Sequence, residues 1–219
     1  MNFNIVIDFD STIVKVETLD VIAKLSSNKN IIQQIEDITN NAMDGTIGFQ
    51  EALSKRIELL KISKNDISST TNLINKSITN SFLKNKNFLK KNSNNCYVVS
   101  GGFKEIIDPI ASHLGFKKEN IFANTFSFKN NIVNGIDKKN LLSNDKGKVE
   151  ILKNHINING KNTIIIGDGF TDYEIKKYNE AKYFIQFIEN INRKSLNSKA
   201  DLIASNFDQI IEFIKVENE

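Results

Sequence analysis

A series of short apolar runs, separated by helical patterns, constrains the fold of this chain more than any other feature. Each run is rich in Val, Ile or aromatic residues and is too short for a helix, which is typical of buried parallel strands. The runs are Asn4–Phe9, Cys96–Ser100, Thr163–Gly167, Tyr183–Phe187 and Asp201–Ala204. Apolar residues at helical spacing occupy 103–114, 149–156 and 207–214. The alternation predicts an α/β fold with a Rossmann-like parallel sheet, covered by helices on both faces.

One stretch interrupts this alternation. From residue 15 to residue 79 there is no strand candidate, and four apolar stripes with helical spacing follow one another instead. They begin at Leu19, Ile31, Phe49 and Ile67. We therefore expect a helical-bundle cap domain, residues 15–79, inserted after the first strand of an α/β core domain that comprises residues 1–14 and 80–219.

Two further segments have distinct patterns. Alternating apolar residues flank Asn130-Asn131 within Ile121–Ile136, which predicts an antiparallel hairpin at the edge of the sheet. The segment Lys84–Asn95 is rich in Asn and Lys, and we expect it to be a short polar connection.

Two carboxylates, Asp8 and Asp10, stand at the end of the first apolar run. Buried carboxylates are costly unless they are paired or bind a cation. These two can share a hard divalent ion, and one of them can attack a phosphorus atom to form an aspartyl-phosphate. A polar turn rich in Asp and Ser is the alternative that these residues alone leave open.

The second run ends in Ser100-Gly101-Gly102, a hydroxyl followed by two glycines. Such a sequence lets backbone N–H groups approach an anion closely at a helix start, although an ordinary strand-to-helix turn has the same residues. Lys146 opens a later helical pattern in the segment Lys-Gly-Lys, and a lysine there can act as a point charge on a phosphate. In a chain rich in lysine, a solvated side chain is the alternative.

A third polar strand end follows the run Thr163–Gly167. Asp168 is a candidate metal ligand with Asp172 as its supporting partner, and an Asp that caps the next helix is the alternative. Because ligands of α/β sheets bind beyond the carboxyl ends of the strands, we expect the three polar strand ends to form one site. Together they supply a nucleophile, a cation site and an anion cradle, which are the requirements of phosphoryl transfer.

Charge and composition exclude several classes of protein. The net charge is +3, from 29 basic and 26 acidic residues, and the basic residues form no long run, so no nucleic-acid partner is indicated. No apolar run approaches the roughly 18 residues of a membrane span, and the N-terminus lacks a signal-peptide pattern. The single cysteine, Cys96, fits a reducing compartment, so we expect a cytoplasmic protein without a membrane partner.

The motifs DFDSTIV, SGG, KGK and GDGFTD, in this order, resemble the four motifs of the haloacid dehalogenase superfamily of phosphotransferases. The resemblance extends from Ile5 to Lys215, and an insertion after the first motif matches the subclass whose cap lies there. Within that subclass, Asp8–Glu17, Ile38–Lys61, VVSGGF and IGDGFTD are similar to the phosphoserine phosphatase family. Phe170 departs from this pattern, because a small residue is common at its position.

The resemblance implies a role for each matching core residue. Asp8 would be the nucleophile that forms a phospho-aspartate, and Asp10 would be the general acid and then the base that activates water. Mg²⁺ would be held by Asp8, the backbone carbonyl of Asp10 and Asp168, with Asp172 close by. The phosphate group of the substrate would be held by Ser100, Gly101, Gly102, Lys146 and Thr171.

On the cap side, the resemblance implies that Glu17 and Arg56 meet the amino-acid part of the substrate, with Met43 and Phe49 as pocket walls. Arg56 suits a carboxylate because its planar fork binds two oxygens at once. The implied reaction is Mg²⁺-dependent hydrolysis of O-phosphoserine to serine and phosphate, a step of serine biosynthesis. The alternatives are a phosphatase or phosphotransferase for another small phosphomonoester, and a non-catalytic module with the same fold.

Overall fold

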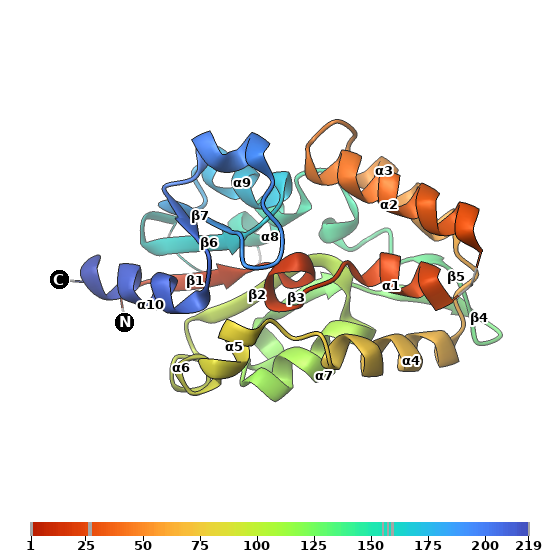
Figure 1. Cartoon of the computed structure of the whole chain (residues 1–219), viewed down its shortest axis with the longest axis horizontal. Coiled ribbons are helices and arrows are strands. Elements are labelled where there is room, and N and C mark those ends of the chain that lie inside the picture. Colours follow the sequence, from red (N-terminus) through yellow and green to blue (C-terminus); the bar gives the residue numbers. More distant parts are fainter. Residues whose placement is uncertain (1, 26–27, 155, 157, 159, 219) are drawn as a thin grey trace.

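The computed structural model describes residues 2–25, 28–154, 156, 158 and 160–218. Its centre is a six-stranded parallel sheet with the strand order β3-β2-β1-β6-β7-β8 (Figure 1). The strands are β1 (Asn4–Ile7), β2 (Cys96–Phe103), β3 (Ile121–Asn124), β6 (Thr163–Gly167), β7 (Tyr183–Phe187) and β8 (Leu202–Ala204). The predicted α/β fold with a parallel sheet is confirmed.

Helices cover both faces of the sheet, and successive strand residues point to opposite faces. Ile5 and Ile7 of β1 lie in one apolar cluster with residues of α5, α6, α7 and α10. Val6, between them, lies in a second cluster with residues of α8 and α9. These helices are α5 (Asn80–Lys84), α6 (Lys86–Lys91), α7 (Lys104–Leu114), α8 (Gly147–Asn154), α9 (Phe170–Lys177) and α10 (Phe207–Val216).

The hairpin prediction for Ile121–Ile136 is partly wrong. Its first part is β3, which joins the edge of the main sheet parallel to β2. Only β4 (Phe126–Lys129) and β5 (Ile132–Ile136) form the antiparallel hairpin, as a separate two-stranded sheet. The turn between them does consist of Asn130 and Asn131, with left-handed φ angles of 50° and 64° that asparagine tolerates.

The expectation of a polar connection over Lys84–Asn95 is also wrong, because α6 occupies the middle of this segment. Leu89 of α6 is completely buried in the core, and Phe88 packs against the same cluster. Two apolar residues among many polar ones are sufficient for a short helix when the sheet supplies the surface they cover.

The segment between β1 and α5 is helical, as predicted. It contains α1 (Thr18–Leu25), α2 (Lys29–Met43), α3 (Phe49–Leu59) and α4 (Lys64–Asn75). Figure 1 shows these helices gathered at one end of the molecule, beyond the carboxyl end of β1. No helix in the described part of the chain has the length and apolar character of a membrane span.

The chain enters and leaves this helical segment at the same place. Val14 and Ile78 form an antiparallel bridge between the outgoing and the returning backbone. The N–H of Lys15 donates to the carbonyl of Ser77 at 2.8 Å. The two crossings therefore lie side by side, directly beside the turn that follows β1.

Candidate active site

Asp8 lies immediately after β1, at the edge of the sheet where α/β proteins bind ligands. Its N–H donates to the carbonyl of Ile166 on the neighbouring strand β6 at 2.9 Å, so strand pairing fixes its backbone. Phe9–Ile13 then form a tight turn in which Asp10 has an extended backbone and Ser11 has a left-handed φ of 53°. Asp8 is only 4% exposed, and a carboxylate so buried requires a positive partner.

That partner is Lys148, in the first turn of α8. Its Nζ lies 2.7 Å from Oδ1 of Asp8 and 2.7 Å from Oδ1 of Asp172. Burial by itself lowers the pKa of the Lys148 ammonium, but the carboxylates of Asp172 and Asp8 raise it above its usual value. Lys148 therefore remains positively charged beside Asp8.

The prediction for Lys146 disagrees with this geometry. Lys146 is exposed, and its Nζ lies over the ring of Tyr178, 4.8 Å from the ring centroid. The position at which α8 begins explains why Lys146 points away from Asp8. The helix starts at Gly147, and side chains two positions apart at a helix start point to different sides. The structure therefore places Lys148, and not Lys146, in the position expected for the phosphate-binding lysine.

Asp168 and Asp172 lie beside Asp8. One carboxylate oxygen from each of the three lies within 4.8 Å of the other two. Asp168 follows β6, and Asp172 in the first turn of α9 accepts from the N–H of Gly169 at 3.0 Å. A Cβ on Gly167 would lie 2.2 Å from the Asp172 carboxyl group, so this glycine makes room for it. Burial raises the pKa of both Asp168 and Asp172 to about 7.

These three carboxylates fit a divalent cation. Lys148 and Arg193 contact them, with Nε of Arg193 2.8 Å from Oδ2 of Asp168. Burial raises the pKa of Asp168 and Asp172, and the neighbouring carboxylates add to the rise, whereas Arg193 and Lys148 oppose it. Carboxylate oxygens are the ligands that hard divalent ions take, so the cluster can hold such an ion.

Asp10 lies on the turn after Asp8 and accepts a hydrogen bond from Oγ1 of Thr18 at 2.5 Å. Burial raises the pKa of Asp10 to about 7; the Thr18 hydrogen bond opposes the rise and the Asp8 charge adds to it. A carboxyl group with a pKa near neutrality can both donate and accept a proton at physiological pH. The environment of Asp10 is therefore suitable for the acid–base role expected of it.

The Ser100-Gly101-Gly102 segment lies opposite this turn. The N–H of Gly102 donates to Oγ of Ser100 at 3.0 Å. A Cβ on Gly102 would lie 3.7 Å from Oδ2 of Asp10, which places the glycine next to that carboxylate. A Cβ on Gly101 would lie 2.4 Å from Cζ of Phe49, so only a glycine lets the Phe49 ring of α3 approach β2 this closely.

One cavity joins these groups. Its floor consists of the core residues Asp8, Asp10, Ser100, Gly101, Gly102, Phe103, Lys148 and Thr171, and its roof consists of Glu17, Leu19, Met43, Phe49 and Arg56. The structure thus brings the predicted chemical residues and the predicted substrate-recognition residues to one space. Asp168 and Asp172 are buried beside Asp8 without lining the cavity, and Lys146 lies outside it.

Beside the cavity, the helical segment between β1 and α5 packs against the start of α9 at two glycines. A Cβ on Gly169 would lie 2.9 Å from Sδ of Met43, and a Cβ on Gly45 would lie 3.0 Å from the ring of Phe170. Gly45 also has a left-handed φ of 77°. The large Phe170 side chain is therefore accommodated because the loop between α2 and α3 presents a glycine to it.

Arg56 is buried in the roof. Its Nη1 donates to Oγ1 of Thr39 at 3.3 Å and its Nε to the carbonyl of Ala52 at 3.2 Å. Burial lowers the pKa of Arg56, although nearby carboxylates, Glu17 first, favour the charged form. In the described part of the chain, no carboxylate oxygen lies within ion-pair distance of this guanidinium.

Glu17 is the acidic group of the roof. It accepts from Oγ of Ser11 at 2.6 Å, and its Oε1 lies 3.6 Å from Nη2 of Arg193. Burial raises the pKa of Glu17 to about 8, and the charge of Asp10 adds to the rise.

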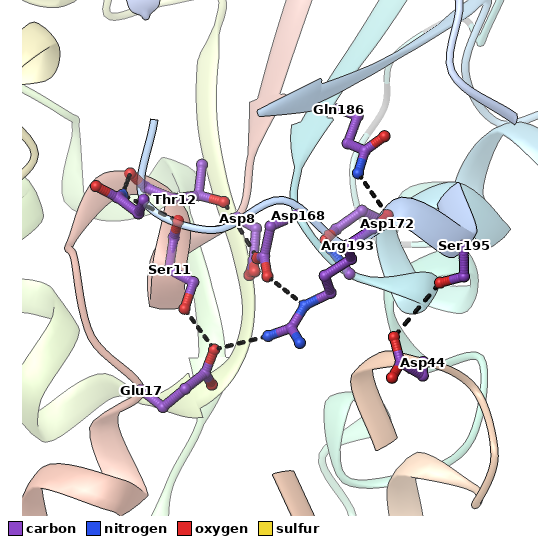
Figure 2. Close-up of polar contacts among 12 residues, drawn as sticks. Asp8, Ser11, Thr12, Glu17, Asp44, Asp168, Asp172, Gln186, Arg193 and Ser195 are labelled. Atoms are coloured by element: carbon purple, nitrogen blue, oxygen red, sulfur yellow. Dashed lines mark hydrogen bonds and ion pairs between the residues drawn. The ribbon is translucent and has the colours of Figure 1, made fainter. Parts of the chain in front are cut away.

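Sequence reasoning missed Arg193, which lies in the loop after β7. Figure 2 shows its guanidinium between Asp168 and Glu17, with a contact to each. Its carbonyl accepts from Nε2 of Gln186 at 2.9 Å, which fixes the loop. Arginine occurs only twice in the chain, and that rarity was the one available signal. No strand or helix periodicity in this loop indicates that it returns to the site.

Comparisons with known proteins show the family of this chain. The family profile described as haloacid dehalogenase-like hydrolase matches residues 4–175. A phosphoserine phosphatase of Campylobacter jejuni subsp. doylei is 34% identical over 218 residues, which cover 96% of this chain and 97% of that protein.

Two solved structures extend the similarity to the fold. A phosphoserine phosphohydrolase-like protein from Francisella tularensis subsp. tularensis SCHU S4 aligns with a TM-score of 0.87 at 30% identity, covering 97% of this chain and 99% of that one. A phosphoserine phosphatase in a phospho-aspartyl intermediate analogue aligns with a TM-score of 0.79 at 28% identity, covering 95% and 97%. The chain belongs to the haloacid dehalogenase-like hydrolases and, within them, to the family of the phosphoserine phosphatases.

Proposed function

We propose that this protein is a Mg²⁺-dependent phosphoserine phosphatase, which hydrolyses O-phosphoserine to serine and phosphate. One observation carries the proposal. The same cavity contains a buried carboxylate, Asp8, in its floor and a buried arginine, Arg56, in its roof that pairs with no carboxylate among the described residues. A small phosphomonoester that also bears a carboxylate satisfies both groups at once.

Mg²⁺ is the cation that we propose for the acidic cluster. Asp8, Asp168 and the backbone carbonyl of Asp10 are the proposed ligands, with Asp172 beside them. Magnesium sites commonly combine one or two carboxylates with substrate phosphate oxygens, which agrees with this donor set. When bound, the ion supplies positive charge that neutralises the phosphate oxygens during transfer.

In the first half of the reaction, a carboxylate oxygen of Asp8 attacks phosphorus and the bond to the serine oxygen breaks. Lys148 holds a phosphate oxygen by its charge, and Ser100, Gly101, Gly102 and Thr171 are the proposed hydrogen-bond donors to the others. Asp10 gives its proton to the serine oxygen, so serine leaves as a neutral alcohol. The pKa of Asp10, raised to about 7, makes the protonated form available.

In the second half, Asp10 is the carboxylate that the first half produced. It takes a proton from a water molecule, whose oxygen attacks the phosphorus of the phospho-aspartate. The bond between phosphorus and the Asp8 oxygen breaks, phosphate leaves, and both carboxyl groups return to their starting states. The relative that was solved as a phospho-aspartyl intermediate analogue supports this route.

Residues 15–79 are the proposed cap domain on a core of residues 1–14 and 80–219. In it, Arg56 would bind the substrate carboxylate, Glu17 would balance the substrate ammonium, and Met43 and Phe49 would form the walls. A contact between core and cap supports the closed arrangement, because the N–H of Gln50 at the start of α3 donates to Oδ1 of Asp145 at 3.0 Å. Closure of such a cap excludes bulk water from the phospho-aspartate.

A phosphate-release screen tests this function. The purified protein is assayed with Mg²⁺ and with a chelator on phosphoserine, a phosphorylated amino alcohol, a sugar phosphate and an aryl phosphate. We expect phosphoserine to give the highest kcat/KM and the chelator to abolish release. A higher kcat/KM on another ester would identify a phosphatase for a different small metabolite. An absence of metal-dependent release from every ester would refute the enzymatic proposal.

We also propose a cytoplasmic location. The cysteine Cys96 is a buried free thiol. Free thiols are typical of proteins in reducing compartments.

A further inference from the structure

The loop that follows β7 returns to the two chain crossings between sheet and helical segment. At its start, the N–H of Ile188 donates to the carbonyl of Ala204 on β8 at 2.8 Å. The carboxylate of Glu189 then accepts from both the N–H and the hydroxyl of Ser81. Beyond Asn190, Nε2 of Gln186 donates to the carbonyl of Arg193. Hydrogen bonds therefore fix the loop on both sides of Asn190.

The side-chain amide of Asn190 faces four oxygens. Its Nδ2 lies 3.0 Å from the carbonyl oxygen of Ser11, 3.2 Å from that of Thr12 and 3.4 Å from that of Val14. It also lies 2.7 Å from Oγ1 of Thr79. The first three oxygens belong to the outgoing chain and the fourth to the returning chain, so one amide group connects both crossings.

The backbone at this place needs such a donor. Ser11 has a left-handed φ, and Thr12 is completely buried. Carbonyls that point out of a tight turn have no partner within it, and a buried carbonyl without a donor destabilises the fold. Thr12 receives a second hydrogen bond, from Oγ1 of Thr79 at 2.7 Å, which joins the two crossings at the same point.

We propose that Asn190 is a positioning residue for the reaction. It holds the turn Phe9–Ile13, and with it Asp10, against the returning chain at Thr79. It acts through the backbone of the turn, since its side-chain amide contacts backbone carbonyls and a hydroxyl rather than groups that line the cavity floor. The inference rests on the proposed function, in which Asp10 must stay aligned with Asp8.

The kinetic test compares Asn190→Ala with a matched control, Asn120→Ala. Asn120 also donates its amide to two backbone carbonyls, those of Ser93 and Cys96 at 2.9 and 3.2 Å, but at the opposite edge of the sheet. We expect Asn190→Ala to lower kcat about tenfold or more with KM changed less than about threefold, because small misplacements of a reacting group are costly. Asn120→Ala should lower the melting temperature and leave kcat near that of the wild type.

Two further variants keep the test decisive if Asn190→Ala is unstable. Asn190→Gln retains both N–H donors and should recover part of the lost kcat. Asn190→Asp has the same size but places oxygen against the four oxygens, and should lose at least as much kcat as the alanine variant. An Asn190→Asp variant with wild-type kcat, or equal kcat losses in Asn190→Ala and Asn120→Ala, would overturn the proposal.

Amide hydrogen exchange gives a readout that does not require activity. We expect the peptides that cover residues 9–16 and 76–80 to exchange faster in Asn190→Ala than in the wild type, and to be unchanged in Asn120→Ala. Unchanged exchange in both peptides would overturn the positioning role. A wild-type protein that is inactive on all phosphomonoesters would instead contradict the proposed function, so the two failures are distinguishable.

Discussion

The floor and the roof of the cavity differ in whether their buried cations form ion pairs. In the floor, Lys148 pairs with Asp8 and Asp172, and Arg193 pairs with the neighbouring Asp168. In the roof, the guanidinium of Arg56 contacts only a hydroxyl and a backbone carbonyl among the described residues. The charged groups at the floor are already ion-paired in the absence of a ligand. Arg56 in the roof forms no ion pair with a described residue, so a ligand carboxylate can pair with it.

This difference separates chemistry from recognition. A network of preorganised charges stabilises phosphoryl transfer whatever alcohol carries the phosphate. A buried cation without its counter-charge discriminates strongly, because a ligand that lacks a carboxylate leaves it unpaired. Substitutions in the floor should therefore affect all substrates alike, and substitutions in the roof should affect them selectively.

The largest effect should come from Asp8→Asn in the floor. We expect kcat to fall by about a thousandfold or more on every phosphomonoester, because an amide does not form the covalent intermediate. Steady-state phosphate release measures the loss, and circular dichroism checks the fold. Robust turnover by this variant would show that Asp8 is not the nucleophile.

Lys148→Ala sharpens the description of the floor, with Lys146→Ala as its matched control. We expect Lys148→Ala to lower kcat/KM about a hundredfold on all substrates, because it removes a charge aimed at the phosphate. Lys146→Ala should stay within about twofold of the wild type, as expected for an exposed side chain. The reverse order of effects in the same assay would contradict the assignment of Lys148.

Arg56→Ala tests the roof. We expect kcat/KM for phosphoserine to fall about thirtyfold or more, and that for a phosphorylated amino alcohol to change less than about threefold. Arg56→Lys serves as the control, since it keeps the charge but loses the planar fork. Equal losses on both substrates would remove the distinction between roof and floor.

A smaller effect should appear in the pH dependence of stability. The pKa values of Asp168 and Asp172 rise to about 7, and that of Glu17 to about 8, mainly through burial. Between the unfolded and folded pKa values the folded state binds more protons, so stability decreases as pH rises. In a chelator, we expect the melting temperature to fall by several degrees from about pH 5 to about pH 8, with Mg²⁺ restoring more of it at the higher pH.

Thermal unfolding of the wild type and of Asp168→Asn measures this dependence. The variant should show a flatter pH profile, because it lacks one of the buried carboxyl groups. A melting temperature that rises over the same interval, or a Mg²⁺ effect that is independent of pH, would contradict the electrostatic description of these buried carboxyl groups.

The strand ends were predictable from the sequence because a strand has a fixed direction and period. The apolar runs Asn4–Phe9 and Thr163–Gly167 predict two parallel strands, and the parallel pairing of β1 with β6 brings Asp8 and Asp168 to the same edge of the sheet. The four apolar stripes at helical spacing between residues 15 and 79 likewise predict the inserted helical segment that the structure contains.

Three features were not predictable from local patterns. Whether Lys146 or Lys148 reaches Asp8 depends on where α8 begins, which tertiary packing decides. β3 belongs to the main sheet rather than to the hairpin because it pairs with β2, and a local pattern does not indicate this pairing with another part of the chain. The loop with Asn190 and Arg193 has no periodicity, so its return to the site is visible only in the folded molecule.

Rapid acid quenching with phosphoserine labelled on its phosphate tests the central claim most directly. We predict that the quenched protein carries the label, that peptide mapping places it on Asp8, and that Asp8→Asn carries none. Label on a different residue, or turnover by the wild type without any labelled protein at any quench time, would contradict a phospho-aspartate at the end of β1.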